Sequence, residues 1–238
     1  MRLLAFETSA KAASVALFDG KTLLGESYQN TGLTHSQTLL VMAQELLKQW
    51  ACKPEDVQAV AVANGPGSFT GVRIGVAAAK GFAWGREIPL YGVSTLEAMA
   101  LGLGVYQGYV CPVMDARRQQ VYNALFYVNQ GRMERITPDR AIALEELKEE
   151  LKNLQESIFL VGDGSILCYN TLEKEVEGLV LPPEHRMHQR AVGVGMAAWE
   201  QISRGDAGDA ATLTPNYLRL SQAERERLAR EEKEKGER

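Results

Sequence analysis

The sequence lacks the features that mark membrane, secreted and disulfide-rich proteins. No apolar run in its 238 residues approaches the roughly 18 residues that a membrane helix needs, and the apolar stretch 3–6 is too short for a signal-peptide core. Its three cysteines, Cys52, Cys111 and Cys168, are odd in number and far apart, so they fit neither a disulfide framework nor paired zinc knuckles. We therefore expect a cytoplasmic protein without membrane contact, whose thiols are reduced and mostly buried.

An excess of basic charge is also lacking. The formal net charge is −4 at pH 7, whereas a chain that binds nucleic acid by itself usually carries a basic surface. No stretch of the sequence interleaves basic and aromatic residues. Binding of free RNA by this chain alone is therefore disfavoured, and any RNA is expected to be held by another subunit.

Hydrophobic periodicity predicts an α/β chain made of two similar halves, each with the order βββαβα. The first half has predicted strands at 3–7, 13–18, 22–28, 59–63 and 89–93, and predicted helices at 34–50, 69–85 and 94–103. The second half has predicted strands at 109–114, 121–128, 132–136 and 158–161, and predicted helices at 144–154 and from 191 onward. We expect an N-terminal lobe at 1–105, a C-terminal lobe at 106–220 and a charged tail at 221–238 that is a solvated helix or frayed.

Polar residues and glycine turns follow corresponding strands in the two halves. Glu7 ends the first strand of one half and Asp115 ends the first strand of the other, so both could face a cleft between the lobes. The candidate nucleotide-binding residues are Glu7, Ser9, Gly65, Gly67, Asp115, Gly162, Asp163 and Gly164. Asp115 is equally consistent with a strand-end residue that caps a turn.

The segment 65–75, GPGSFTGVRIG, joins a predicted strand to a predicted helix, where free backbone N–H groups favour an anion. It does not match the P-loop pattern, because Thr70 stands where the second glycine should be and Gly71 where the lysine should be. It also lacks the dinucleotide-binding fingerprint. Enzymes with an ordinary phosphate motif are therefore disfavoured.

Small residues form a stripe along the helix predicted after this segment. Gly71, Gly75, Ala78 and Phe82 share one helical face, and each glycine costs about 0.5 to 1 kcal/mol relative to alanine. The stripe would let another backbone approach closely, either in the lobe's own sheet or in another chain. If it faces another chain, enlarging Gly75 to leucine abolishes assembly but leaves the monomer folded. Arg73, near the positive end of the helix dipole, is expected to have an acidic partner within the lobe or across an interface.

With this segment the sequence resembles the TsaB family, also called YeaZ, whose bacterial members are required for making threonylcarbamoyladenosine in tRNA. The resemblance also rests on ETS at 7–9, THS at 34–36, GVSTLE at 92–97, DAR at 115–117, GDG at 162–164 and NYLR at 216–219. It implies an α/β, actin-like fold, related to sugar kinases and Hsp70, of two ribonuclease-H-like βββαβα lobes. The order of the predicted elements indicates the same layout independently.

The resemblance implies a non-catalytic subunit of the complex that transfers threonylcarbamoyl to adenosine 37 of tRNA. Its implied partners are TsaD, the catalytic paralogue that it docks and activates, and the small ATPase TsaE. Without TsaD it would form a homodimer, and it would meet tRNA only through the complex. No catalytic residue, metal or cofactor is expected in this chain, and ATP or ADP would act at the level of the complex. The paired histidine ligands of TsaD-like proteins are missing, because Leu39 stands four residues after His35.

Docking is expected through the helices at 34–50 and 69–85. The expected interface residues are His35, Leu39, Met42, Ala43, Phe69, Thr70, Gly71, Arg73, Gly75, Ala78 and Phe82. His35 also fits a surface cap at the start of its helix. Trp50 and Trp84, which end the two helices, are expected in the core.

The alternative function is an autonomous actin-like ATPase or phosphotransferase that uses Glu7 and Asp115. The family commonly has aspartate at position 7, and the extra methylene of glutamate would move the carboxylate by roughly one ångström. Because a metal held near phosphates tolerates little displacement, efficient ATP hydrolysis is disfavoured.

Overall fold

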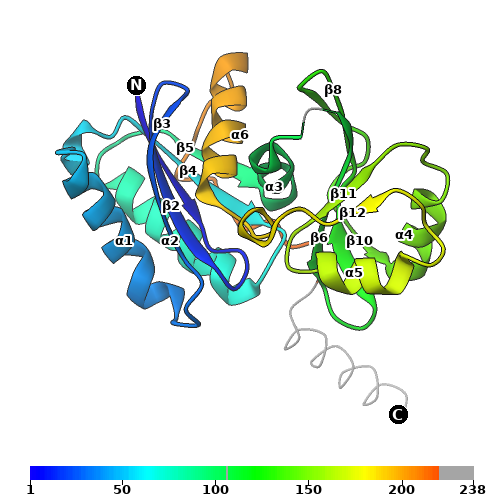
Figure 1. Cartoon of the computed structure of the whole chain (residues 1–238). Helices are drawn as coiled ribbons and strands as arrows, with labels where there is room; N and C mark the ends of the chain where they lie inside the picture. Colours follow the sequence, from blue (N-terminus) through cyan, green and yellow to red (C-terminus); the bar gives the residue numbers. More distant parts are fainter. Residues whose placement is uncertain (106, 220–238) are drawn as a thin grey trace, which may run out of the picture.

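Two β-sheets, each with helices on its faces, form the core of the protein (Figure 1). The computed structural model describes residues 1–105 and 107–219, so the predicted tail at 221–238 lies outside the described residues. None of the helices in the described part is long and apolar enough to cross a membrane. The three cysteines are free and buried, as predicted.

Lobe one is built on a five-stranded sheet with the order β3-β2-β1-β4-β5. Its strands are β1 (Arg2–Glu7), β2 (Ala13–Asp19), β3 (Thr22–Gln29), β4 (Ala59–Gly65) and β5 (Leu90–Ser94). The central strand β1 is antiparallel to β2 and parallel to β4. All five predicted strands of the first half are confirmed.

Helices cover both faces of this sheet (Figure 1), which explains why β1 is apolar on both sides. α1 (His35–Gln49) and α2 (Phe69–Trp84) pack on the face that includes Leu4 and Phe6. α6 (Ala191–Arg204) packs on the opposite face, over Leu3 and Ala5. α3 (Thr95–Leu103) packs beside α6 and also reaches lobe two.

Lobe two repeats the strand order of lobe one. Its sheet runs β10-β7-β6-β11-β12, with β8 and β9 added to the side of β6. Its elements are β6 (Gly108–Asp115), β7 (Gln120–Asn123), β8 (Phe126–Asn129), β9 (Arg132–Arg135), β10 (Arg140–Ala143), α4 (Leu144–Leu151), β11 (Ile158–Val161), α5 (Ser165–Leu172) and β12 (Leu179–Val180). α4 and α5 cover one face, and α3 covers the other through Leu96 and Met99.

The predicted third strand of lobe two is wrong in one respect. The strand at 132–136 exists as β9, but it pairs only with β8, and β10 takes the sheet position that corresponds to β3. The predicted strand at 121–128 is divided into β7 and β8. At the break, the buried amide of Asn123 donates to Pro112 O at 3.1 Å and Ala124 O at 3.0 Å, replacing ladder hydrogen bonds.

α6, which the sequence predicts as the last helix of the second half, packs on the sheet of lobe one instead. A Cβ at Gly193 of α6 would lie 1.9 Å from Ala98 O, and one at Gly195 would lie 2.1 Å from the Phe18 ring. These two glycines therefore let α6 approach α3 and β2 closely. Within the predicted C-terminal lobe, the described residues from α6 to 219 thus pack on lobe one rather than on the second sheet.

The chain after α6 runs back along α2. Lys80 Nζ donates to Ala211 O at 3.2 Å and to Leu213 O at 2.9 Å. Asn216 N donates to Asn64 O at 2.7 Å, at the end of β4. Residues 205–219 are called the return segment below.

Candidate interaction surface and interlobe cleft

The solvent face of α2 is unusually small and apolar. Its exposed residues recur at helical spacing as Thr70, Arg73, Ala77, Gly81 and Trp84. A Cβ added at Gly81 would meet no atom within 4 Å, and the Trp84 side chain is 64% exposed. The expectation that Trp84 lies in the core is wrong.

α1 lies beside α2 and also exposes apolar side chains (Figure 1). Leu40 and Val41 are 54% and 57% exposed. Trp50, which directly follows α1, is 45% exposed, so its predicted core position is wrong as well. The exposed apolar residues Leu40, Val41, Ala77, Gly81 and Trp84 are called the two-helix face below.

The glycine stripe of α2 lies on the other side of the helix. A Cβ at Gly71 would lie 2.1 Å from Thr8 O, and one at Gly75 would lie 2.3 Å from Thr8 Oγ1. The Thr8 hydroxyl donates to Gly71 O at 2.8 Å. Of the two alternatives left open by the sequence, the structure thus places Gly71 and Gly75 against the lobe's own sheet.

Most other predicted interface residues also pack inside lobe one. Leu39, Met42 and Ala43 are buried in the core between α1 and the sheet. Ala78 and Phe82 are partly buried, and the Phe82 ring meets the Phe6 ring edge to face, with centroids 6.5 Å apart. Of the predicted interface residues, Thr70 and Arg73 are the two that are exposed.

Phe69 and Arg73 both contact Tyr217 of the return segment. The Phe69 and Tyr217 rings are stacked, with centroids 4.4 Å apart and planes 14° apart. Arg73 Nε donates to Tyr217 Oη at 2.6 Å, and the guanidinium lies 5.4 Å from the centroid of that ring. Within the described residues Arg73 therefore has aromatic partners where an acidic one was expected.

His35 begins α1 and fixes the loop that follows β1. Its Nε2 donates to Ala10 O at 2.8 Å. The preceding Thr34 makes no side-chain cap, whereas Ser68 and Ser94 do cap α2 and α3, as their hydroxyls accept from Gly71 N and Glu97 N.

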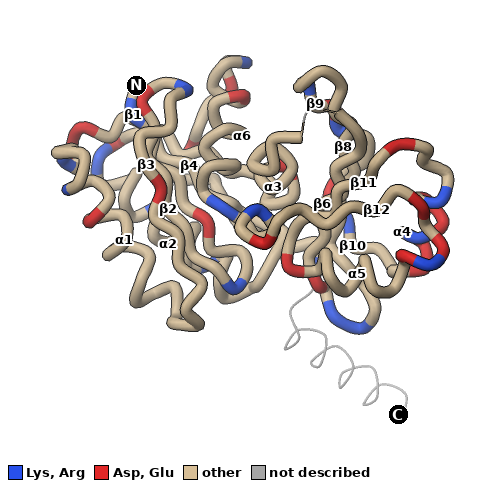
Figure 2. Tube along the Cα trace, viewed as in Figure 1, with Lys and Arg blue, Asp and Glu red and all other residues tan. Residues whose placement is uncertain are grey.

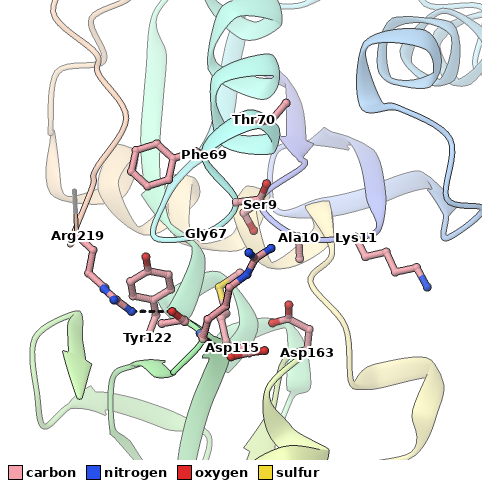
Figure 3. A pocket seen from close by; sticks show the side chains of 14 residues that line it. Ser9, Ala10, Lys11, Gly67, Phe69, Thr70, Asp115, Tyr122, Asp163 and Arg219 are labelled. Carbon is pink, nitrogen blue, oxygen red and sulfur yellow. Dashed lines mark hydrogen bonds between the residues drawn. The ribbon is translucent and has the colours of Figure 1, made fainter. Parts of the chain in front are cut away.

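A cleft of about 560 Å³ lies between the two lobes (Figure 3). Four of the predicted nucleotide-binding residues, Ser9, Gly67, Asp115 and Asp163, line it. Asp115 Oδ1 accepts from Arg117 N at 2.6 Å, so it does cap a turn. The pKa of Asp163 is raised, chiefly because its surroundings in the cleft restrict hydration of the carboxylate.

The remaining predicted glycines serve close packing of the backbone. Gly65 and Gly162 have φ values of 122° and 112°, which favour glycine. A Cβ at Gly65 would lie 2.5 Å from Asn216 O, one at Gly162 2.3 Å from Val113 O, and one at Gly164 3.0 Å from Asp115 N. These three residues shape the walls of the cleft without lining it.

Glu7 is fully buried and does not line the cleft. Its Oε1 accepts from Ser9 N at 2.5 Å, and its Oε2 has no hydrogen-bond partner among the described residues. Burial raises the pKa of Glu7 to about 7, despite the opposing hydrogen bonds from Ser9 and Thr8. Glu7 therefore holds the turn after β1, and Ser9 stands between it and the open space.

Several residues that line the cleft were not among the predicted site residues. Lys11, Tyr122 and Arg219 all line it, although the Lys11 side chain points outward (Figure 3). Arg219 Nη1 donates to Ala116 O at 2.6 Å and so ties the return segment to lobe two. The only sequence signal for this contact was that DAR at 115–117 and NYLR at 216–219 both belong to the motifs that carry the resemblance.

No cluster of three metal-ligating side chains occurs among residues 1–105 and 107–219. His185 lies in a short 3-10 turn, Glu184–Arg186, and His188 follows that turn two residues later, so the two histidines do not share a helical face.

Comparison with known proteins shows which family this chain resembles over nearly its whole length. Residues 29–227 match the family model of TsaD, tRNA N6-adenosine threonylcarbamoyltransferase. The chain is 33% identical to the tRNA threonylcarbamoyladenosine biosynthesis protein TsaB of Bacillus subtilis, over 94% of this chain and 96% of that one. It is also 33% identical to the Escherichia coli protein of that name, over 92% of this chain and 95% of that one.

Solved structures support the fold. YeaZ from Pseudomonas aeruginosa superposes with a TM-score of 0.75 at 26% identity, covering 91% of this chain and 99% of that one. The ethanolamine utilization protein EutJ from Carboxydothermus hydrogenoformans superposes with a TM-score of 0.53 at 11% identity, covering 83% and 90%, and so shares the fold alone. The prediction of an actin-like α/β fold of two similar lobes is confirmed.

Proposed function

Since this chain belongs to the TsaB family and takes part in tRNA threonylcarbamoyladenosine biosynthesis, we propose that it acts there as a non-catalytic subunit that docks and activates the TsaD-type transferase. The observation that carries this proposal is the two-helix face of α1 and α2. In a free monomer, this surface leaves large apolar side chains and an unprotected glycine in water.

The chemistry of the two-helix face suits a helical partner. Ala77 and Gly81 are small, so a helix backbone can approach α2 closely. Leu40, Val41 and Trp84 surround them with apolar area that gains free energy when it is buried. Polar neighbours such as Gln44 and Lys48 border the apolar patch on the exposed side of α1.

The match to the TsaD family model supports a partner of related architecture. A transferase with the same fold would present helices that correspond to α1 and α2, and the two pairs of helices could pack as a four-helix contact. The same face could pair with a second copy of this chain when the transferase is absent, because such a contact is isologous. We therefore propose a heterodimer in the complex and a homodimer without it.

The interlobe cleft supports a role without catalysis by this chain. The strand-end acid Glu7 is buried under Ser9, so it cannot reach a ligand in the cleft directly. We propose that transfer of threonylcarbamoyl takes place on the partner, and that the ATPase TsaE and its nucleotide act on the assembled complex. We also propose that assembly takes place in the cytoplasm, where tRNA is modified.

Reconstitution with and without this chain tests the proposal. Threonylcarbamoyl transfer to unmodified tRNA is measured with TsaD, TsaE and threonylcarbamoyl-adenylate, with the chain present, absent, or alone. We expect product only when this chain and TsaD are both present. Unchanged product in its absence would contradict the proposal.

The alternative is autonomous hydrolysis of ATP, favoured by the presence of Asp115 and Asp163 in a cleft between actin-like lobes. This alternative predicts that the chain alone hydrolyses ATP and that an Asp115→Asn variant hydrolyses it more slowly. Turnover that is absent, or unaffected by that substitution, would exclude it.

A further inference from the structure

Basic side chains from four separate parts of the chain lie in the lining of the interlobe cleft or on the loops and helix that border it. Lys11 follows β1, Arg117 lies between β6 and β7, and Arg219 ends the return segment; all three line the cleft (Figure 3). Arg118 neighbours Arg117 in the same loop, and Arg73 lies near the start of α2. These five residues are called the basic rim below.

The basic rim is not neutralised by neighbouring acids in the way that other cations of this chain are. Among the described residues, no carboxylate oxygen lies within 4.0 Å of the charged nitrogens of the basic rim. In contrast, Lys148 and Lys152 near α4 each pair with two glutamates, and Figure 2 shows charges of both signs around that helix. The cleft lining holds three of these cations, Lys11, Arg117 and Arg219, against two acids, Asp115 and Asp163, so it is locally positive by one charge although the whole chain carries a net charge of −4.

The loop that carries two of the arginines has an unusual backbone. Arg117, Arg118 and Gln119 have φ values of 62°, 57° and 55°, a left-handed conformation that residues with a Cβ disfavour. Such strain in a polar exposed loop is typical of functional sites. It holds two neighbouring guanidinium groups on one short loop at the cleft.

Two further features of the cleft suit an anion. The N-terminal turn of α2, with Phe69 and Thr70, lies along the cleft, where the helix dipole is positive. Ser9 also lines the cleft, is fully buried, and its Oγ has no hydrogen-bond partner among the described residues. A phosphate oxygen in the cleft would compete for that hydroxyl with the neighbouring Glu7 carboxylate, whose Oε2 also has no hydrogen-bond partner among the described residues.

Aromatic side chains adjoin the basic rim. Tyr217 is 40% exposed and stacks on Phe69, beneath the Arg73 guanidinium. Tyr122 lines the cleft itself. Aromatic rings next to arginines are the combination on which unpaired bases stack while their phosphates are neutralised.

These features fit a phosphodiester chain better than a nucleoside triphosphate. Triphosphates are usually bound with a metal ion held by carboxylates. Glu7 is buried away from the cleft, and of the two acids that line it, Asp115 caps its own turn at Arg117 N and Asp163 accepts a hydrogen bond from Gln189. Single phosphodiesters each carry one charge and can be bound by separated cations, which is how the basic rim is arranged.

We infer that the basic rim and the Phe69–Tyr217 stack bind the backbone of a single-stranded RNA segment, the exposed loop of the tRNA substrate, within the complex. This inference rests on the proposed function. It assigns to this chain a share of RNA binding that its net charge and linear sequence did not indicate.

The test uses the full chain assembled with the transferase and a fluorescently labelled, unmodified anticodon stem-loop RNA. The test variant is Arg117→Gln with Arg118→Gln. The matched control is Arg132→Gln, an exposed arginine on β9, which lies toward the opposite end of β6. Assembly of each variant is first checked by co-elution, so that failure to form the complex is separated from failure to bind RNA. If no complex forms, the proposed function fails and the same titration is made on the chain alone.

We expect the double variant to bind RNA at least about tenfold more weakly than the wild type, with assembly unchanged. The salt dependence should weaken by about 1.4 in the slope of log affinity against log salt, about 0.7 for each lost phosphate contact with a single strand. The control should bind as the wild type does. RNA affinity that is the same in the double variant and the control would overturn the inference, and so would displacement of the RNA by ATP alone, which would make the cleft a nucleotide site.

Discussion

Thr8 occupies the space that a side chain at Gly75 would need. Its Oγ1 lies 2.3 Å from the position of a Cβ on Gly75, and it donates its proton to Gly71 O at 2.8 Å. The strand end of β1 is therefore locked to α2 by two glycines and one hydroxyl. The small residues that first suggested an interface belong to the framework of lobe one, and the surface left for a partner is on the opposite side of the same helix.

Gly75→Ala should destabilise the monomer. Its Cβ would overlap Thr8 Oγ1, so we expect the free energy of unfolding to fall by about 1 to 3 kcal/mol in urea denaturation. Gly81→Ala is the matched control on the same helix, and because nothing lies near its Cβ, it should gain about 0.5 to 1 kcal/mol. Equal effects of the two substitutions would show that the stripe is not internal.

Tyr217→Ala should loosen the return segment. Loss of the stack on Phe69 removes about 0.5 to 1.5 kcal/mol in addition to the buried area. We expect faster hydrogen exchange in residues 205–219 and little change in the strands of lobe two. Tyr217→Phe retains the stack and loses only the hydrogen bond from Arg73, so it should have a smaller effect. If both variants exchange like the wild type, the stack does not hold the segment.

Glu7 should make stability fall as the pH rises. Burial raises its pKa from 4.5 to about 7 in the folded state, so between these values the folded protein holds a proton that the unfolded chain has released. Stability due to this group is complete below about pH 4.5, decreases up to about pH 7 and is constant above, a total of about 3 kcal/mol.

Glu7→Gln cannot titrate and should flatten that dependence in urea denaturation at pH 5, 6, 7 and 8. Glu45→Gln, an exposed substitution on α1, serves as the control and should retain the slope of the wild type. A slope in Glu7→Gln that matches the wild type would place the titrating group elsewhere.

Local patterns predicted the framework of the protein well. The apolar runs of β1 and β4 depend on neighbours in sequence, and the structure confirms them. The position of α6 could not be predicted in this way, because the contact of Gly195 with Phe18 joins residues that are far apart in the chain.

The interface residues show a different limit. Leu39, Met42 and Ala43 follow the apolar spacing of α1, which indicates the side of a helix that packs on its own sheet. The useful signal was Leu40 and Val41, which are apolar but lie outside that spacing. The basic rim gave no signal beyond the motifs DAR at 115–117 and NYLR at 216–219, since its members are separated by up to 208 residues, from Lys11 to Arg219, and only the fold brings them together.

The most direct test of the account is whether the two-helix face binds the transferase. Leu40→Asp and Gly81→Leu are made in the full chain, with Lys21→Asp as a surface control outside the face, and binding to purified TsaD is measured by calorimetry. Because both positions are exposed, we expect the variants to fold with wild-type stability within about 1 kcal/mol. Their affinity for TsaD should fall at least about tenfold, and threonylcarbamoyl transfer should fall in parallel. The control should bind TsaD as the wild type does. Folded variants that bind TsaD and support transfer as well as the wild type would contradict the account.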